Sequence, residues 1–128
     1  MHSNESAENY LEAILVLSQT LPVVRSVDVA EKLSFRKSSV SVAMKNLREK
    51  KQITMSPEGY IQLTASGRAI AEMIYERHRL ISSWLKNLGV DENVATEDAC
   101  RIEHVISVET FDALKAHAAK VGAETSAN

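Results

Sequence analysis

The sequence has little of what holds together disulfide-rich, membrane-spanning or β-rich proteins. Its 128 residues include one cysteine, two prolines and four glycines, and only 5% of them are aromatic. The single Cys100 excludes a disulfide within the chain and is typical of a reducing compartment. No apolar run approaches the roughly 20 residues that cross a bilayer, and the first ten residues lack the basic and apolar parts of a secretory signal. We therefore expect a mainly α-helical, cytoplasmic protein that does not enter a membrane.

Charge is unevenly distributed, although the formal net charge is only -2. Residues 25–51 carry eight basic and three acidic side chains, whereas residues 91–124 carry eight acidic and three basic ones. This asymmetry favours two partners of opposite sign, one for each segment. Two ordinary solvated surfaces would give the same pattern.

Apolar periodicity and capping residues predict six helices and one hairpin. Helices are expected over 5–19, over 27–33 with Ser26 as N-cap, and from residue 37 or 38 to about 50. Two alternating runs flank the turn residues 56–59 and predict a β-hairpin over 53–63. Thr64 is expected to cap a long helix that Gly89 ends, followed by helices over 91–106 and, after Ser107, to about Gly122.

Residues 1–63 are predicted to form a winged helix-turn-helix domain that binds double-stranded DNA. Its second short helix is the one whose N-terminal side chains enter the major groove in such motifs. Short serine hydroxyls allow close approach, Val42 suits a thymine methyl, and Arg36 suits guanine or phosphate. The alternative is a solvated amphipathic helix. The predicted DNA-binding residues are Arg36, Lys37, Ser38, Ser39, Ser41, Val42 and Lys45.

Residues 64–128 contain a group of metal-ligand side chains in the segment DACRIEHVIS. Cys100, Glu103 and His104 are spaced by three and four residues, so they are expected on one face of the helix predicted over 91–106. Thiolate, carboxylate and imidazole together suit a transition metal. Each residue also has an ordinary structural explanation: Cys100 as a core thiol, Glu103 as a surface acid and His104 as an interior imidazole.

Three more side chains are plausible ligands. His78 lies in the long helix within YERHRLI, and Glu12 lies in the first helix within ENYLEAI. Asn9 is one turn before Glu12 and offers a carbonyl oxygen, which is a weaker ligand than a carboxylate. His117 is interpreted as a surface residue.

The words ENYLEAI, AEKLSFRKSSVSVAMKNL, GYIQLTASG, ERHRLISSWL and DACRIEHVIS resemble the diphtheria-toxin-repressor and manganese-transport-regulator family over about residues 5–118. The resemblance implies an N-terminal winged helix that binds operator DNA and a helical C-terminal domain, residues 64–128, that forms a homodimer and binds metal as corepressor. It also implies that the ligands are Glu12, His78, Cys100, Glu103 and His104, with Asn9 at a further ligand position. The implied function is metal-dependent repression of metal-uptake genes.

The metal predicted from these residues is Fe²⁺, with Mn²⁺ next. Cys100 stands where iron-type members of the family have cysteine, whereas manganese-type members have glutamate there. Glu12 follows the manganese type, and Ser82 and Thr96 stand where iron-type members supply further ligands. A thiolate favours softer ions over Mn²⁺, so iron is the first expectation.

Two other functions fit parts of the sequence. One is a winged-helix regulator gated by a small organic ligand, or ungated, in which the metal-ligand residues belong to the core. The other is a zinc hydrolase with Glu103 as base, which the absence of an HExxH or similar motif disfavours. We therefore expect a regulator rather than an enzyme.

Overall fold

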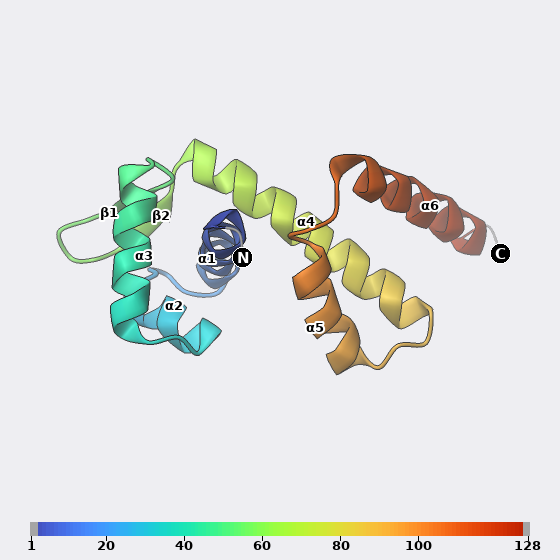
Figure 1. The fold of residues 1–128 in the computed structure, drawn as a ribbon, viewed down its shortest axis with the longest axis horizontal. Coiled ribbons are helices and arrows are strands. Elements are labelled where there is room, and N and C mark those ends of the chain that lie inside the picture. The colour runs from blue at the N-terminus through green and yellow to red at the C-terminus, as the bar shows by residue number, and fades with distance from the viewer. Residues whose placement is uncertain (1–2, 127–128) are drawn as a thin grey trace. The chain divides into compact units, whose positions relative to one another are not determined.

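The computed structural model describes residues 3–126 and is mainly helical, as predicted (Figure 1). The described chain falls into two compact units that divide between Met73 and Ile74. A predicted functional boundary between residues 63 and 64 stays a prediction. The elements are α1 (Ser3–Ser18), α2 (Ser26–Leu33), α3 (Lys37–Glu49), β1 (Ile53–Met55), β2 (Ile61–Leu63), α4 (Ala65–Asn87), α5 (Glu92–Ile102) and α6 (Val108–Ser126).

The first unit is a helix-turn-helix followed by a hairpin. Its core contains apolar side chains from α1, α2, α3 and β2, among them Leu11, Ile14, Val29 and Val40, none more than 1% exposed. Buried residues of α3 recur at spacings of four and three, Val40, Met44 and Leu47, which leaves the opposite face of this helix in solvent. This exposed face is the one that the winged-helix prediction assigns to DNA.

A short antiparallel ladder builds the hairpin of the first unit. Ile53 pairs with Leu63 and Met55 with Ile61, and an isolated bridge joins Val24 to Ile61. Gly59 adopts a φ of 86° in the connecting turn, where its N–H donates to the carbonyl of Ser56 at 2.9 Å. Glycine adopts a positive φ without steric cost. Gly59 therefore permits the tight turn that joins β1 to β2, as the prediction of a hairpin required.

Helix α2 begins differently from the prediction. Ser26 is its first residue rather than its N-cap, which is Arg25. The backbone N–H of Arg25 donates to a carboxylate oxygen of Asp28 at 2.9 Å, and the guanidinium of Arg25 donates to the hydroxyl of Tyr60 at 3.2 Å. The predicted cap is wrong because Asp28 and the hairpin residue Tyr60 together hold Arg25 at the start of the helix.

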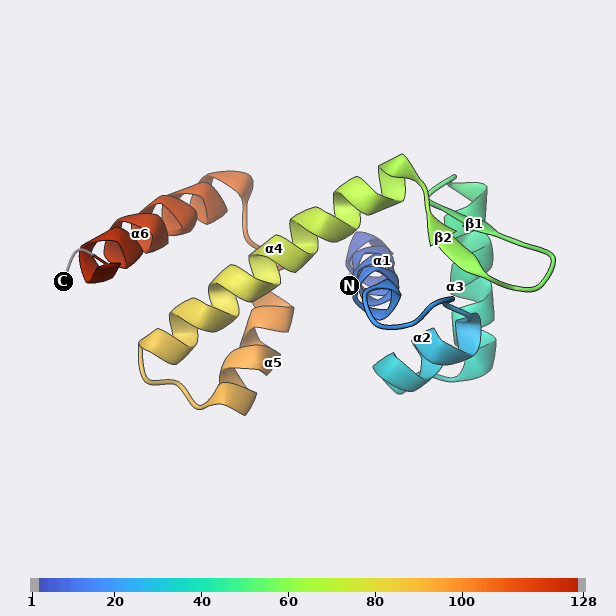
Figure 2. The same ribbon diagram turned by 180° about the vertical axis from the view of Figure 1, so that it is seen from behind.

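In the second unit, the chain continues from α4 into α5 and then α6 (Figure 2). Arg77 of α4 contacts the turn between α5 and α6. Lys115 of α6 binds the carboxylate of Glu76 on α4 at 3.1 Å. Ser107 caps α6 as predicted, since its hydroxyl accepts the N–H of Thr110 at 3.1 Å. The helix runs to Ser126, beyond the predicted end near Gly122.

None of the described helices is long and apolar enough to cross a membrane.

The start of α4 lies close to the backbone of Gln52. Thr64 caps α4 as predicted, because its hydroxyl accepts the N–H of Gly67 at 3.1 Å, and its own N–H donates to the carbonyl of Gln52 at 3.1 Å. A Cβ atom at Gly67 would lie 2.0 Å from that carbonyl oxygen. Glycine at position 67 therefore permits the close approach of helix and loop.

We predict that Gly67→Ala lowers the free energy of unfolding by about 1–3 kcal/mol, the usual cost of overpacking. The added methyl group meets backbone atoms, which cannot move aside as a flexible side chain does. Urea denaturation followed by circular dichroism measures the change, with the exposed neighbour Ser66→Ala as control. Without the close contact, alanine would stabilise the helix over glycine by about 1 kcal/mol, so a variant more stable than the wild type by that amount would contradict the contact.

Candidate metal centre and DNA-binding surface

Glu103 is the centre of a cluster of metal-ligand side chains in the second unit. Its side chain is 0% exposed, and its two carboxylate oxygens have different neighbours. One oxygen lies 2.9 Å from Nδ1 of His78, and the other lies 3.3 Å from Nε2 of His104. A buried carboxylate is costly unless other groups pair with it, and the two imidazoles are the partners that the chain supplies.

Cys100 completes this cluster as a half-buried free thiol. The ligand atoms of Cys100, Glu103 and His104 all lie within 4.8 Å of one another. Bonds from a transition metal to nitrogen, oxygen and sulfur are about 2.0–2.3 Å, so neighbouring donors on a tetrahedral ion lie about 3.3–3.8 Å apart. The donor set therefore suits a divalent transition-metal ion, and the three side chains would draw closer together around it.

The structure corrects how these three side chains come together. We predicted one helical face, but α5 ends at Ile102, so only Cys100 is helical. Glu103 follows the helix directly and His104 lies in the turn before α6. Arg77 of α4 donates hydrogen bonds to the carbonyls of Glu103 and Ile106, each at 3.1 Å, and so contacts both ends of the turn that carries His104. This contact is tertiary, so helical spacing does not reveal it.

The remaining predicted ligands have different positions. His78 lies on α4 in the second unit and contacts Glu103, as given above. Glu12 and Asn9 lie one turn apart on α1, in the first unit, and both are half-buried. Their part in the site stays a prediction. Ser82 is 6% exposed on α4, and the hydroxyl of Thr96 donates to the carbonyl of Glu92 within its own helix at 2.9 Å.

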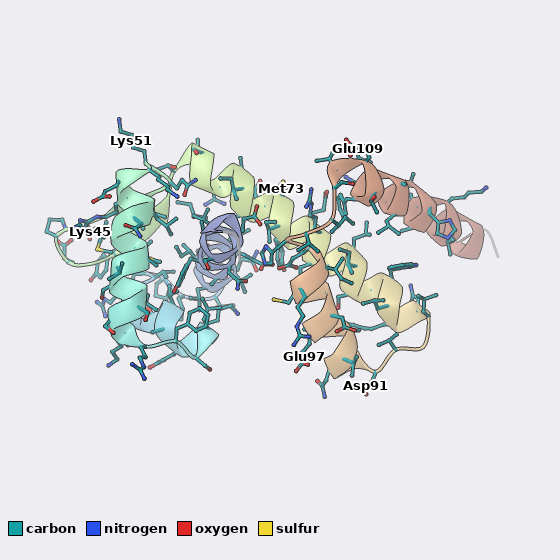
Figure 3. All side chains as sticks on the ribbon, in the orientation of Figure 1. Lys45, Lys51, Met73, Asp91, Glu97 and Glu109 are labelled. Carbon is teal, nitrogen blue, oxygen red and sulfur yellow. The ribbon has the colours of Figure 1, made fainter. Side chains whose placement is uncertain are left out.

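The predicted DNA-binding residues all lie in solvent at the N-terminal part of α3 or just before it. Arg36 is the N-cap, and the others follow within three turns. Val42 is 60% exposed, so its methyl groups are available to a partner. Figure 3 labels Lys45 on α3 and Lys51 just beyond its end. The exposed residues are Arg36, Lys37, Ser38, Ser39, Ser41, Val42 and Lys45.

The hairpin tip carries an acid that the prediction of the DNA-binding surface did not include. The N–H of Glu58 and the hydroxyl of Ser56 lower the pKa of the exposed Glu58 carboxyl, so this group stays negatively charged at neutral pH. The exposed face of α3 is basic, whereas the tip of the wing opposes phosphate. Sequence reasoning also missed Arg25 as the link between the start of α2 and the hairpin residue Tyr60.

Both halves of the chain match models of iron-dependent repressors. Residues 2–61 match the N-terminal DNA-binding domain of these repressors, and residues 64–122 match their metal-binding and dimerisation domain. A winged helix in one unit and a cluster of metal-ligand side chains in the other together define the class, that of metal-responsive transcriptional regulators. The chain belongs to the iron-dependent repressor family, and the predicted resemblance is confirmed.

Relatives with known descriptions are transcriptional regulators. The regulator MntR of Escherichia coli O157:H7 is 34% identical over 123 residues, which cover 96% of this chain and 79% of that protein. An uncharacterised HTH-type transcriptional regulator of Methanocaldococcus jannaschii is 32% identical over 114 residues, covering 88% of this chain and 91% of its own. These relatives are not enzymes, which removes support from the hydrolase alternative.

Solved structures of manganese-responsive repressors share the fold. A manganese-dependent transcriptional repressor in complex with manganese has a TM-score of 0.81 and 27% identity, covering 88% of this chain and 52% of that one. The manganese regulator SloR has a TM-score of 0.78 and 28% identity, covering 87% of this chain and 52% of its own. The chain therefore spans about half the length of these solved relatives.

We predict that a bound divalent ion protects Cys100 from thiol reagents. A coordinated thiolate is blocked, so Mn²⁺ or Co²⁺ should slow the reaction of Cys100 roughly tenfold or more. Because the chain has a single cysteine, a colorimetric thiol assay reports this position alone. His104→Ala, which removes one donor, should lose most of the protection. Equal rates with and without metal in the wild type would place the ion elsewhere.

Proposed function

We propose that this protein is a metal-dependent transcriptional repressor that binds operator DNA as a homodimer when a divalent cation occupies the Glu103 cluster, and that it controls metal-uptake genes. The main support is the grouping of Cys100, Glu103 and His104 within the half of the chain that matches the family's metal-binding and dimerisation domain. The exposed basic face of α3, in the half that matches the DNA-binding domain, supports DNA as the partner.

The proposed ligands are the predicted set of six residues. The two oxygens of Glu103 contact different imidazoles, so this carboxylate suits a site that takes one ion or shares its oxygens between two. When bound, the cation supplies positive charge and fixed coordination directions to these side chains. Glu12 and Asn9 would contribute from α1 of the first unit. The set is Asn9, Glu12, His78, Cys100, Glu103 and His104.

The choice of metal depends on two opposing observations. Cys100 is a soft ligand, which favours Fe²⁺ over Mn²⁺. The names of the relatives, MntR and the manganese-dependent repressor, favour Mn²⁺. We propose that both ions activate the protein and that Mn²⁺ is the better candidate for the physiological one, which revises the preference drawn from Cys100 alone.

Homodimerisation is proposed to occur through the second unit. The core of this unit is small and leaves several of its apolar side chains exposed to solvent. Burial of these side chains between two copies of the chain would stabilise a dimer through the hydrophobic effect. Two DNA-binding units in one dimer must present their recognition helices about 34 Å apart, the length of one turn of DNA. The exposed residues are Leu88, Val94, Val105 and Val108, from 47% to 70% exposed.

The variants His104→Ala and Cys100→Ala are predicted to lose metal-activated DNA binding while remaining folded. Loss of groups around a metal commonly costs about 10–100-fold in affinity, and these two donate directly. Fluorescence anisotropy on operator DNA, titrated with Mn²⁺ and with Fe²⁺, measures the effect. Circular dichroism controls for folding, and the exposed His117→Ala is the matched histidine control.

Cys100→Glu should shift the preference toward Mn²⁺ in the same assay, because it replaces a soft ligand with a hard one. If His104→Ala and Cys100→Ala respond to both ions as the wild type does, the metal site is not at this cluster. A regulator gated by a small organic ligand, or ungated, would then be the better interpretation.

DNA binding is predicted to depend steeply on salt. If a dimer neutralises about 6–10 phosphates, the slope of log affinity against log salt should be roughly -5 to -9. In the same titrations, Arg36→Ala should change the sequence preference, whereas Lys50→Ala should weaken all sequences alike. An affinity that does not vary with salt would contradict DNA as the partner.

A further inference from the structure

Arg77 is a buried cation that the predicted ligand set does not include. It lies on α4 directly before His78 and is only 7% exposed. Burial of a guanidinium is costly unless its donors are satisfied. One of its nitrogens, Nη1, donates to the carbonyls of Glu103 and Ile106, each at 3.1 Å. The guanidinium carbon also lies 5.3 Å from the centre of the Phe111 ring, within the range of a cation–π contact.

These contacts fasten both ends of the turn that carries His104. The last carbonyls of a helix have no partner within it, and α5 ends at Ile102. Arg77 binds the carbonyl at the start of the following turn, Glu103, and the one at its end, Ile106. The Phe111 ring, in the first turn of α6, packs against the same guanidinium. A single side chain of α4 therefore bridges the two ends of this turn, whose own N–H groups at Val105 and Ile106 donate to the carbonyl of Ile102 at 3.1 and 3.2 Å.

Two consecutive residues of α4, Arg77 and His78, contact Glu103, one at its main-chain carbonyl and the other at its side-chain carboxylate. Arg77 binds the main-chain carbonyl at 3.1 Å, and Nδ1 of His78 lies 2.9 Å from the carboxylate. This arrangement fixes both the backbone and the side-chain direction of Glu103. We propose that Arg77 is a positioning residue that prearranges Glu103 and His104 for the cation. The inference rests on the proposed function, since it concerns how that same metal site is assembled.

Because Arg77 is positively charged, the direction in which metal affinity changes on its removal tests its role. A positive guanidinium near a cation site repels the cation, so removal of the charge alone would strengthen metal binding. Removal of the clamp would release the turn and weaken metal binding, because the ligands must be ordered during binding at a cost in conformational entropy. The two effects oppose each other. Weaker binding after loss of the guanidinium therefore identifies positioning as the dominant role.

The test compares Arg77→Met, Arg77→Lys and Arg79→Met in titrations of the full chain with Co²⁺, whose absorption bands report coordination geometry and thiolate ligation. Arg77→Met should bind Co²⁺ roughly 10–100-fold more weakly than the wild type, the usual cost of losing a group that orients ligands. Its bands, including the one from Cys100, should also change. Arg77→Lys should be intermediate, because one ammonium does not reproduce a planar guanidinium. Arg79→Met removes an exposed guanidinium that lies 5.7 Å from the Tyr75 ring of the same helix, and should match the wild type.

Metal-free thermal unfolding separates fold stability from positioning. A lower melting temperature of Arg77→Met with unchanged Co²⁺ affinity and spectrum would overturn the proposal, as would tighter Co²⁺ binding. If Arg77→Met does not fold, the test is made with Arg77→Lys instead. Co²⁺ affinity and a spectrum equal to those of the wild type in Arg77→Lys would then overturn the proposed positioning role of Arg77. The titration needs no DNA. A wild type that binds Co²⁺ but gains no DNA affinity would contradict the proposed function, while weaker binding by Arg77→Met would still support the clamp.

Discussion

The buried carboxylate of Glu103 is the interaction on which the rest of the proposed mechanism depends. An ionised group in the interior is stable only beside compensating charge or hydrogen-bond donors. The chain places an imidazole on each side of it, His78 from α4 and His104 from the turn, with the thiol of Cys100 nearby. Such a concentration of donors is an inefficient way to build a core, since apolar residues would pack there at lower cost. It is an effective way to bind a cation, and this is why we assign the cluster a metal.

The proposed regulation requires two states of the chain that differ in metal affinity. A ligand shifts an equilibrium only by as much as its affinities for the two states differ. In the proposed mechanism the cation would make that difference by binding the Glu103 cluster more tightly in the state that binds DNA. The acidic second half therefore has a chemical partner in the cation, and the basic face of α3 has one in phosphate. The uneven charge of the sequence is explained by these two partners of opposite sign.

Local signals in the sequence predicted most of the elements, whereas tertiary contacts determined the details of the site. Thr64 and Ser107 cap their helices as expected because their hydroxyls act within one turn. The predicted end of α5 near Ile106 is wrong: the helix ends at Ile102, and Arg77, 26 residues before Glu103, binds two carbonyls of the turn that follows. A signal for Arg77 was nevertheless present: it lies on the same face of α4 as the buried Ile74 and Ile81, three and four residues away. An arginine on a buried stripe needs acceptors, and the sequence alone does not say which.

The most direct test of the central claim is the dissociation constant of Mn²⁺ measured with and without operator DNA. Linkage requires that DNA strengthen metal binding by the same factor by which metal strengthens DNA binding. Because typical couplings are 1–3 kcal/mol, we predict a decrease in the Mn²⁺ dissociation constant of about 5–150-fold when DNA is present. An Mn²⁺ dissociation constant that is the same with and without DNA would contradict the claim that the Glu103 cluster controls DNA binding.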